Sequence, residues 1–331
     1  MLITKTRRTI IESLSAHDAA HVLRYYQENQ RHLSPWEPVR GPEYLTLPYW
    51  ETFLKKAEHA GREGSEFRFA AFTPDRSEIV GICNFTGVAR GVFQACFLGF
   101  SVAARFESQG MMFEILQAAI DHIFNTAGLN RIMANYMPAN LRSGRLLERL
   151  GFEREGCARR YLKIAGKWED HVLTSLVNKV SLRSLSSNDL DLVTSIWTNP
   201  VVRQYLGGPV SVTNAAERLP QMLKSDGSGA WFFVAEYEGA DAGIISIDRC
   251  HGNDNYEISY QFLPEFWGKG VAYASVRQAM NFARSVGITE LTAETQAMND
   301  RSNKLLTRLG MTEKNRLERF GAAQIVYTCR L

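Results

Sequence analysis

The sequence predicts two tandem α/β domains built on one plan, over residues 1–178 and 179–331. At 331 residues the chain is longer than one typical domain. A block that starts with Asn140-Leu-Arg-Ser143 and runs through two leucines to Leu-Gly returns 159 residues later (299 − 140), starting with Asn299-Asp-Arg-Ser302. Solenoid repeats have periods of about 20–50 residues, so this longer period indicates a repeated domain.

Apolar periodicity predicts the elements of the first domain in order. Strict alternation marks strands, whereas apolar residues three and four apart mark helices. The predicted helices are 16–30, 45–60, 112–126 and 141–150, and the predicted strands are 66–72, 78–85, 93–102, 131–136 and 171–177. Two prolines and a tryptophan predict a loop over 32–38.

The second domain follows the same rules. The predicted helices are 189–197, 215–223, 273–282 and 302–309, and the predicted strands are 231–237, 242–248, 256–260, 290–295 and 324–331.

Composition favours a globular protein of the reducing cytoplasm. Apolar residues make up 45% of the chain, and the net charge of +3 does not point to a nucleic-acid partner. The five cysteines lie far apart without a Cys-x-x-Cys pair, so most are expected to be small core residues. We expect no membrane span, no signal peptide and no metal site, because the sequence lacks the corresponding patterns.

A glycine-containing turn joins the strand 256–260 to the helix 273–282. Gly268 and Gly270 allow backbone conformations in which a Cβ would clash. The free N–H groups of the first helical turn then point into the loop, together with the positive end of the helix dipole, and Lys269 adds charge nearby. Such a turn is typical of a phosphate-binding site.

This turn and the block at Asn299 together resemble the acetyl-CoA-binding core of the GCN5-related N-acetyltransferase (GNAT) superfamily. The loop of that family reads Arg/Gln-x-x-Gly-x-Gly/Ala; Gly270 and Ala272 fit it, and Trp267 occupies the Arg/Gln position. The resemblance implies that each domain has a mixed, mostly antiparallel sheet flanked by helices. It also implies acetyl-CoA as cosubstrate and no metal.

The resemblance further implies two sets of acetyl-CoA contacts. In the second half these are Gln261, Phe262, Trp267, Gly268, Lys269, Gly270, Val271, Ala272 and Asn299, and in the first half Val102, Gln109, Gly110, Met111, Met112 and Asn140. In the family a backbone N–H at the position of Val102 and Phe262 stabilises the oxyanion. Asn140 and Asn299 match a position that contacts the pantetheine arm, although a plain turn residue would also be an asparagine.

The first half resembles the bacterial N-acetyltransferases that modify the alanine N-terminus of ribosomal protein S5. The resemblance covers roughly residues 10–178 and rests on five segments: 29–38, 90–99, 109–114, 131–138 and 168–173. The second half resembles the superfamily and its ribosomal-protein branch more generally.

The loop of the first half departs from the family pattern. Glu107 stands at the Arg/Gln position and Ser108 where glycine is common. A carboxylate about 4 Å from a phosphate would cost up to about 4 kcal/mol at an effective dielectric near 20. We therefore expect weaker cofactor binding in the first half, unless Glu107 turns to solvent.

Three side chains are candidates for proton transfer. Ser143 and Ser302 match the position where ribosomal-type members place a serine near the sulfur, and either could instead be a helix N-cap. Glu257 matches an acid that takes the amine proton through water, although an exposed strand carboxylate would look the same. The first half has Phe97 at that position, which leaves Tyr161 and His171 as candidate bases.

The expected acceptor is a protein N-terminal amine. An α-amine with a pKa near 8 is about one-tenth neutral at pH 7, whereas a lysine near 10.4 carries a handicap of about 3 kcal/mol. The first half points to a ribosomal protein, and its basic run Arg159-Arg160 with Lys163 either faces an acidic ribosomal surface or is simply solvated. Two alternatives remain: acetylation of a small-molecule amine, and a binding protein for acetyl-CoA or the ribosome with one non-catalytic half.

Overall fold

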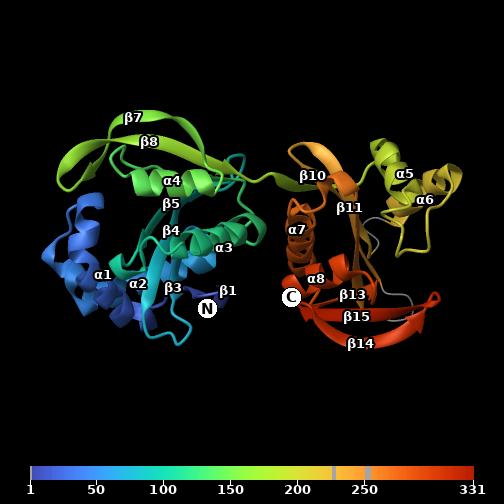
Figure 1. Cartoon of the computed structure of the whole chain (residues 1–331), viewed down its shortest axis with the longest axis horizontal. Helices are drawn as coiled ribbons and strands as arrows, with labels where there is room; N and C mark the ends of the chain where they lie inside the picture. The colour runs from blue at the N-terminus through green and yellow to red at the C-terminus, as the bar shows by residue number, and fades with distance from the viewer. Residues whose placement is uncertain (1, 226–228, 250–254) are drawn as a thin grey trace. The chain divides into compact units, whose positions relative to one another are not determined.

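The computed structural model describes residues 2–225, 229–249 and 255–331, so Cys250 lies outside the described residues. It divides into two compact units, Met1–Asn178 and Lys179–Leu331, which are described separately. Each unit is a mixed, mostly antiparallel sheet with helices, as the sequence predicts (Figure 1).

The first unit contains an eight-stranded sheet in the order β1-β2-β3-β4-β5-β6-β8-β7. Only β5 and β6 are parallel neighbours. The strands are β1 (Leu2–Lys5), β2 (Ile10–Ser13), β3 (Phe67–Phe72), β4 (Ile79–Ala89), β5 (Ala95–Val102), β6 (Arg131–Met133), β7 (Glu153–Ile164) and β8 (Lys167–Val177). The helices are α1 (Ala19–Leu33), α2 (Leu47–Glu63), α3 (Met111–Asn125) and α4 (Leu141–Arg149), with 3₁₀ turns η1 (Ala16–Asp18), η2 (Ser34–Trp36), η3 (Pro42–Leu45) and η4 (Ala104–Phe106).

Helices cover both faces of the first sheet. The apolar stripe of α3, which includes Ile115, Leu116, Ala119 and Ile123, is buried against one face together with Leu147 of α4. The buried side chains of α1 and α2 pack on the other face. Burial of a side chain of this size contributes about 1.5–3 kcal/mol, so the spacing of these residues fixes how α3 lies on the sheet.

The second unit repeats this plan with seven strands in the order β14-β15-β13-β12-β11-β10-β9. Among the described strands of this unit, only β12 and β13 are parallel neighbours. The strands are β9 (Val180–Ser184), β10 (Trp231–Tyr237), β11 (Ala240–Arg249), β12 (Tyr256–Phe262), β13 (Glu290–Gln296), β14 (Thr312–Arg319) and β15 (Ala322–Arg330). The helices are α5 (Leu190–Thr198), α6 (Val212–Ser225), α7 (Val271–Ser285) and α8 (Asp300–Arg308), with 3₁₀ turns η5 (Ser187–Asp189) and η6 (Pro264–Phe266). In this unit α7 packs on one face of the sheet, and α5 and α6 pack on the other.

Two sequence-based expectations about the fold were wrong in part. The segment 32–38 is not all loop, because α1 continues to Leu33 and η2 follows, with Pro35 in its first turn where its missing N–H costs nothing. Of the described cysteines, Cys83 and Cys96 are buried, but Cys157 is exposed on β7 and Cys329 is partly exposed.

Candidate active site

The two parallel strands of each sheet separate after a few residues. In the first unit the pairing of β5 with β6 ends at Phe97, which lies opposite Met133, although β5 itself continues to Val102. In the second unit the pairing of β12 with β13 ends at Glu257, which lies opposite Thr292, although β12 itself continues to Phe262. Beyond these points one edge of each strand has backbone N–H and C=O groups that no neighbouring strand takes up, and a bound chain can use them.

A glycine lets the end of each splayed strand approach its other neighbour. Gly81 pairs with Val102, and a Cβ on Gly81 would lie 2.9 Å from the carbonyl oxygen of Ser101. Gly243 pairs with Phe262, and its Cβ would lie 2.5 Å from both the Gln261 oxygen and the Phe262 ring. The position expected to supply the oxyanion N–H is therefore packed against a glycine in both halves.

The turns after β5 and β12 share one backbone conformation. Gly268 and Gly270 have φ values of 75° and 79°, and Ser108 and Gly110 have 58° and 71°. Ser108 thus adopts the left-handed conformation that its glycine counterpart adopts, at a cost of about 1–2 kcal/mol for a residue with a Cβ. The serine does not change the path of the turn.

Both turns open a helix whose N-cap residue is a glycine, which has no side chain to cap the first N–H groups. The N-caps are Gly110 for α3 and Gly270 for α7. Met111, Met112 and Val271 are buried, so these residues can offer a ligand only their backbone. A helix that begins at a glycine with a left-handed backbone conformation can bind a diphosphate group through its first N–H groups.

The remaining loop residues hold the turns in place. Gln109 donates from Nε2 to the Arg105 carbonyl at 2.7 Å, and its own carbonyl accepts from Arg8 at 2.9 Å. Trp267 donates from its indole to the carbonyl of Phe262 at 2.8 Å. The ammonium group of Lys269 lies 5.6 Å from the ring centre of Phe266, and Ala272 is partly exposed at the helix start.

An arginine in the final helix of each unit contacts the residue that enters the turn. Arg142 forms an ion pair with Glu107 at 2.6 Å, and the Nε2 atom of His32 lies 3.5 Å from the same carboxylate. At the matching position, Arg301 lies 4.4 Å from the ring centre of Trp267. The negative charge of Glu107 is therefore paired, which removes most of the basis for expecting phosphate repulsion in the first half.

Asparagines, not serines, are the N-caps of α4 and α8. Asn140 accepts from the backbone N–H of Ser143 at 3.1 Å, and Asn299 accepts from that of Ser302 at 3.2 Å. The alternative that the two serines cap these helices is thus wrong. Each serine instead sits in the first turn with its hydroxyl outside the cap.

Ser302 makes a side-chain contact that the sequence analysis missed. Its hydroxyl oxygen lies 2.6 Å from that of Tyr260 on the splayed part of β12. Burial raises the pKa of Tyr260 to about 12, against a smaller lowering by this hydrogen bond. The first unit has Phe100 at the corresponding position (260 − 160), which has no hydroxyl to offer Ser143.

Glu257 and Gln261 lie on the opposite face of β12 from Tyr260, because side chains alternate along a strand. Ile258 and Phe262, which share the face of Tyr260, pack with α7. The structure therefore does not bring Glu257 together with Ser302. The Oε1 atom of Gln261 is buried without a hydrogen-bond partner in the described structure, so it has an unused acceptor for a ligand.

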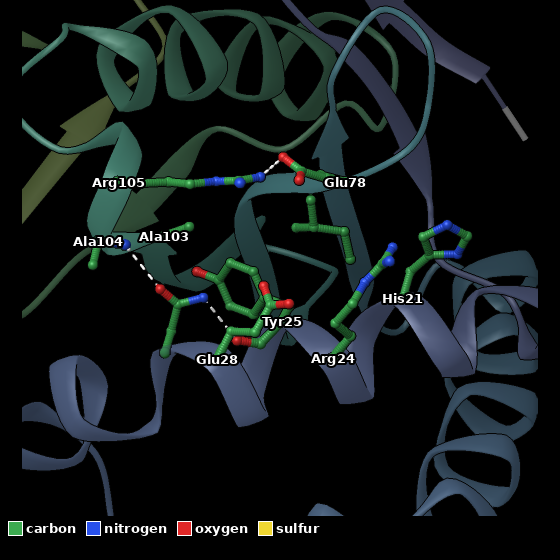
Figure 2. Close-up of a pocket in the computed structure, with 10 residues that line it drawn as sticks. His21, Arg24, Tyr25, Glu28, Glu78, Ala103, Ala104 and Arg105 are labelled. Carbon is green, nitrogen blue, oxygen red and sulfur yellow. Dashed lines mark hydrogen bonds and ion pairs between the residues drawn. The ribbon is translucent and has the colours of Figure 1, made fainter.

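Figure 2 shows a cleft of about 160 Å³ between α1 and the turn that follows β5. Arg105 and Glu78 pair at its rim, and Tyr25 projects from α1. The hydroxyl of Tyr25 bonds with Ser101 of β5 at 2.9 Å, and the side chain of Asn29 accepts from the N–H of Ala104 at 2.8 Å. These bonds fix α1 against the end of the splayed strand.

The candidate bases of the first unit lie on the β7–β8 hairpin. Tyr161 accepts from Asn135 at 3.2 Å, and the ring of His171 lies 5.5 Å from that of Tyr161. The sequence analysis did not consider Glu37. Burial raises the pKa of this half-buried carboxyl, against a smaller lowering by Arg40.

No group of three or more His, Cys, Asp and Glu side chains is placed to hold a metal ion within residues 2–225, 229–249 and 255–331. Within the same ranges no helix is long and apolar enough to cross a membrane.

Comparison with known proteins gives matches in both units. The acetyltransferase (GNAT) domain family matches residues 8–153 and again residues 179–312. The [ribosomal protein uS5]-alanine N-acetyltransferase of Escherichia coli K12 is 47% identical over 171 residues, which are 52% of this chain and 88% of the relative. That match is longer than the 153 residues of the second unit (331 − 178), so it includes residues of the first.

Two further relatives are more distant. The probable N-acetyltransferase YjcK of Bacillus subtilis 168 is 29% identical over 174 residues, which are 53% of this chain and 96% of the relative. The crystal structure of ribosomal-protein-S5-alanine acetyltransferase from Vibrio fischeri is 32% identical with a TM-score of 0.52, and the match covers 53% of this chain and 96% of that one.

Proposed function

The chain belongs to the GNAT acetyltransferase family, and from this premise we propose that it acetylates protein N-terminal α-amines with acetyl-CoA. We propose that the first half acts on the alanine N-terminus of a ribosomal protein. One observation carries this: the 47% identity over 171 residues to an enzyme named for that activity.

A backbone N–H at the end of the separated strand and a serine hydroxyl support the acetyl transfer in this proposal. The backbone N–H of Val102 or Phe262 stabilises the oxyanion that forms when an amine attacks the thioester. Ser143 or Ser302 donates to the departing sulfur. Because about one-tenth of an α-amine is already neutral at pH 7, such a site needs no strong base.

Both halves hold acetyl-CoA in this proposal. The two turns share their backbone conformation, and both helices begin at a glycine N-cap without a side chain. The ion pair between Glu107 and Arg142 supports binding in the first half, because it neutralises the charge next to the phosphate position. The expectation of weaker cofactor binding in the first half loses its main support for the same reason.

An assay of CoA thiol release tests the acceptor. A peptide that begins with alanine is compared with the same peptide acetylated at its N-terminus but carrying an internal lysine, with spermidine, and with no acceptor. We expect turnover with the free alanine N-terminus at least 100-fold above that with the blocked peptide, because lysine has a handicap of about 3 kcal/mol. Equal turnover with both peptides, or a preference for spermidine, would contradict the proposal.

A further inference from the structure

The hydroxyl pair of the second unit lies where β12 and β13 have already separated. Pairing of the two strands ends at Glu257, three residues before Tyr260. Ser302 belongs to the first turn of α8, the helix that follows β13. The hydrogen bond of 2.6 Å between Tyr260 and Ser302 thus joins the two sides of the splay.

We propose that Tyr260 is a positioning residue that orients the hydroxyl of Ser302 toward the sulfur of the thioester in the second unit. This inference rests on the proposed function and deepens it for one half. In this proposal Tyr260 donates and Ser302 accepts, because a phenol is the more acidic of the two hydroxyls. The hydrogen of Ser302 is then left for another acceptor, and the backbone bond to Asn299 fixes where the serine stands.

The phenol of Tyr260 keeps its proton over the working pH range. An ordinary tyrosine pKa near 10 already ensures this at neutral pH, and burial raises the pKa of Tyr260 further, to about 12. During the reaction the acceptor nitrogen bonds to the acetyl carbon, and the carbon–sulfur bond breaks with its electron pair passing to sulfur. Ser302 donates a hydrogen bond to that sulfur, and the proton lost by the nitrogen balances the one that the thiol gains through solvent. Tyr260 neither gains nor loses a proton overall.

The first unit lacks this hydrogen bond between two hydroxyls, because it has Phe100 at the position that corresponds to Tyr260. The second unit also offers a matched control. Tyr327 donates to Asn303 at 3.1 Å, and Asn303 is next to Ser302 in α8. A Tyr327→Phe change therefore removes one buried tyrosine hydrogen bond to α8 without touching Ser302.

The test uses the full chain carrying Gly110→Asp, which places a carboxylate in the phosphate turn of the first half. Turnover is measured by thiol release with the alanine peptide and with spermidine, before and after adding Tyr260→Phe, Ser302→Ala, both, or Tyr327→Phe. We expect Tyr260→Phe to lower kcat about tenfold, the effect of one lost hydrogen bond of about 1.4 kcal/mol. The KM for acetyl-CoA stays within twofold, and the double variant loses no more than Ser302→Ala alone.

The outcomes distinguish the role of Tyr260 from the catalytic role of the second half. If the Gly110→Asp parent turns over and Tyr260→Phe leaves that turnover unchanged, the role of Tyr260 is overturned. The catalytic role of the second half is not affected by that result. Losses that multiply in the double variant, or an equal loss in Tyr327→Phe, would overturn the role of Tyr260 as well, because they indicate independent or merely structural effects. A parent without turnover on either acceptor would overturn both this inference and the catalytic role of the second half.

Discussion

At the scale of single residues, Arg142 and Arg301 occupy matching positions and face different partners. Arg142 pairs with the carboxylate of Glu107, whereas Arg301 stacks on Trp267. Guanidinium groups suit both roles, since they are planar, permanently charged and able to stack on aromatic faces. The same helix position therefore supports the entry to the phosphate turn in both halves.

The first prediction concerns Arg142 in a chain whose second half is disabled by Gly270→Asp. Arg142→Ala leaves Glu107 without its arginine beside the phosphate position, so acetyl-CoA binding by calorimetry should weaken about tenfold. Adding Glu107→Gln to Arg142→Ala should restore most of the affinity. If Arg142→Ala alone has no effect, the ion pair is irrelevant to the cofactor.

The second prediction concerns pH and Tyr260. Its pKa is raised to about 12 in the folded protein, against about 10 when unfolded, because burial disfavours the phenolate. Its contribution to stability is therefore present below about pH 10 and is lost as the pH rises toward 12. Denaturant unfolding at pH 9 and pH 11.5 should show a smaller alkaline loss of stability in Tyr260→Phe than in wild type. Equal losses would contradict the buried phenol.

At the scale of elements, the third prediction concerns the glycine behind each splayed strand. Gly243→Ala would place its Cβ 2.5 Å from the carbonyl oxygen of Gln261 and from the Phe262 ring. We expect a loss of about 1–3 kcal/mol in unfolding free energy and a lower kcat in the second half, because the oxyanion N–H moves. Gly239→Ala is the control, since no atom lies within 4 Å of its Cβ position, although its φ of 82° adds conformational strain. A kcat unchanged by Gly243→Ala would contradict the importance of this contact.

Elements with a buried apolar stripe could be predicted from the sequence, and exposed edge strands could not. The ends of the helices α3 and α7 were predicted within three residues, since their buried positions repeat every three to four residues. The edge strands β7 and β14 were missed, because most of their side chains are exposed and no regular alternation of buried and exposed residues results. They are strands because β8 and β15 pair with them.

The candidate site was predictable in its backbone and less so in its side-chain partners. Glycine spacing points to the phosphate turns, because only a few residue types tolerate left-handed backbone. The bonds from Arg142 to Glu107 and from Tyr260 to Ser302 join residues 35 and 42 positions apart, and periodicity carries no information on such pairs. Matching the two copies residue by residue, Tyr260 against Phe100, was the signal that could have revealed the second pair.

At the scale of the whole molecule, a repeated sequence gives two units with different side-chain chemistry. The second unit has Glu257, Tyr260 and Trp267 where the first has Phe97, Phe100 and Glu107. The phosphate turns, the splayed strands and the capping asparagines are common to both. We therefore propose acetyl-CoA binding in both halves, and the hydroxyl pair of Tyr260 and Ser302 in the second half only.

Binding of acetyl-CoA by both halves can be tested by measuring the binding stoichiometry with calorimetry. Wild type is compared with Gly110→Asp and with Gly270→Asp. Aspartate tolerates left-handed backbone better than most residues and brings a carboxylate to the phosphate position, so each variant should fold and lose one site. Circular dichroism checks the folding. We expect two sites in wild type and one in each variant, whereas a single wild-type site that Gly110→Asp leaves unchanged would show that the first half does not bind acetyl-CoA.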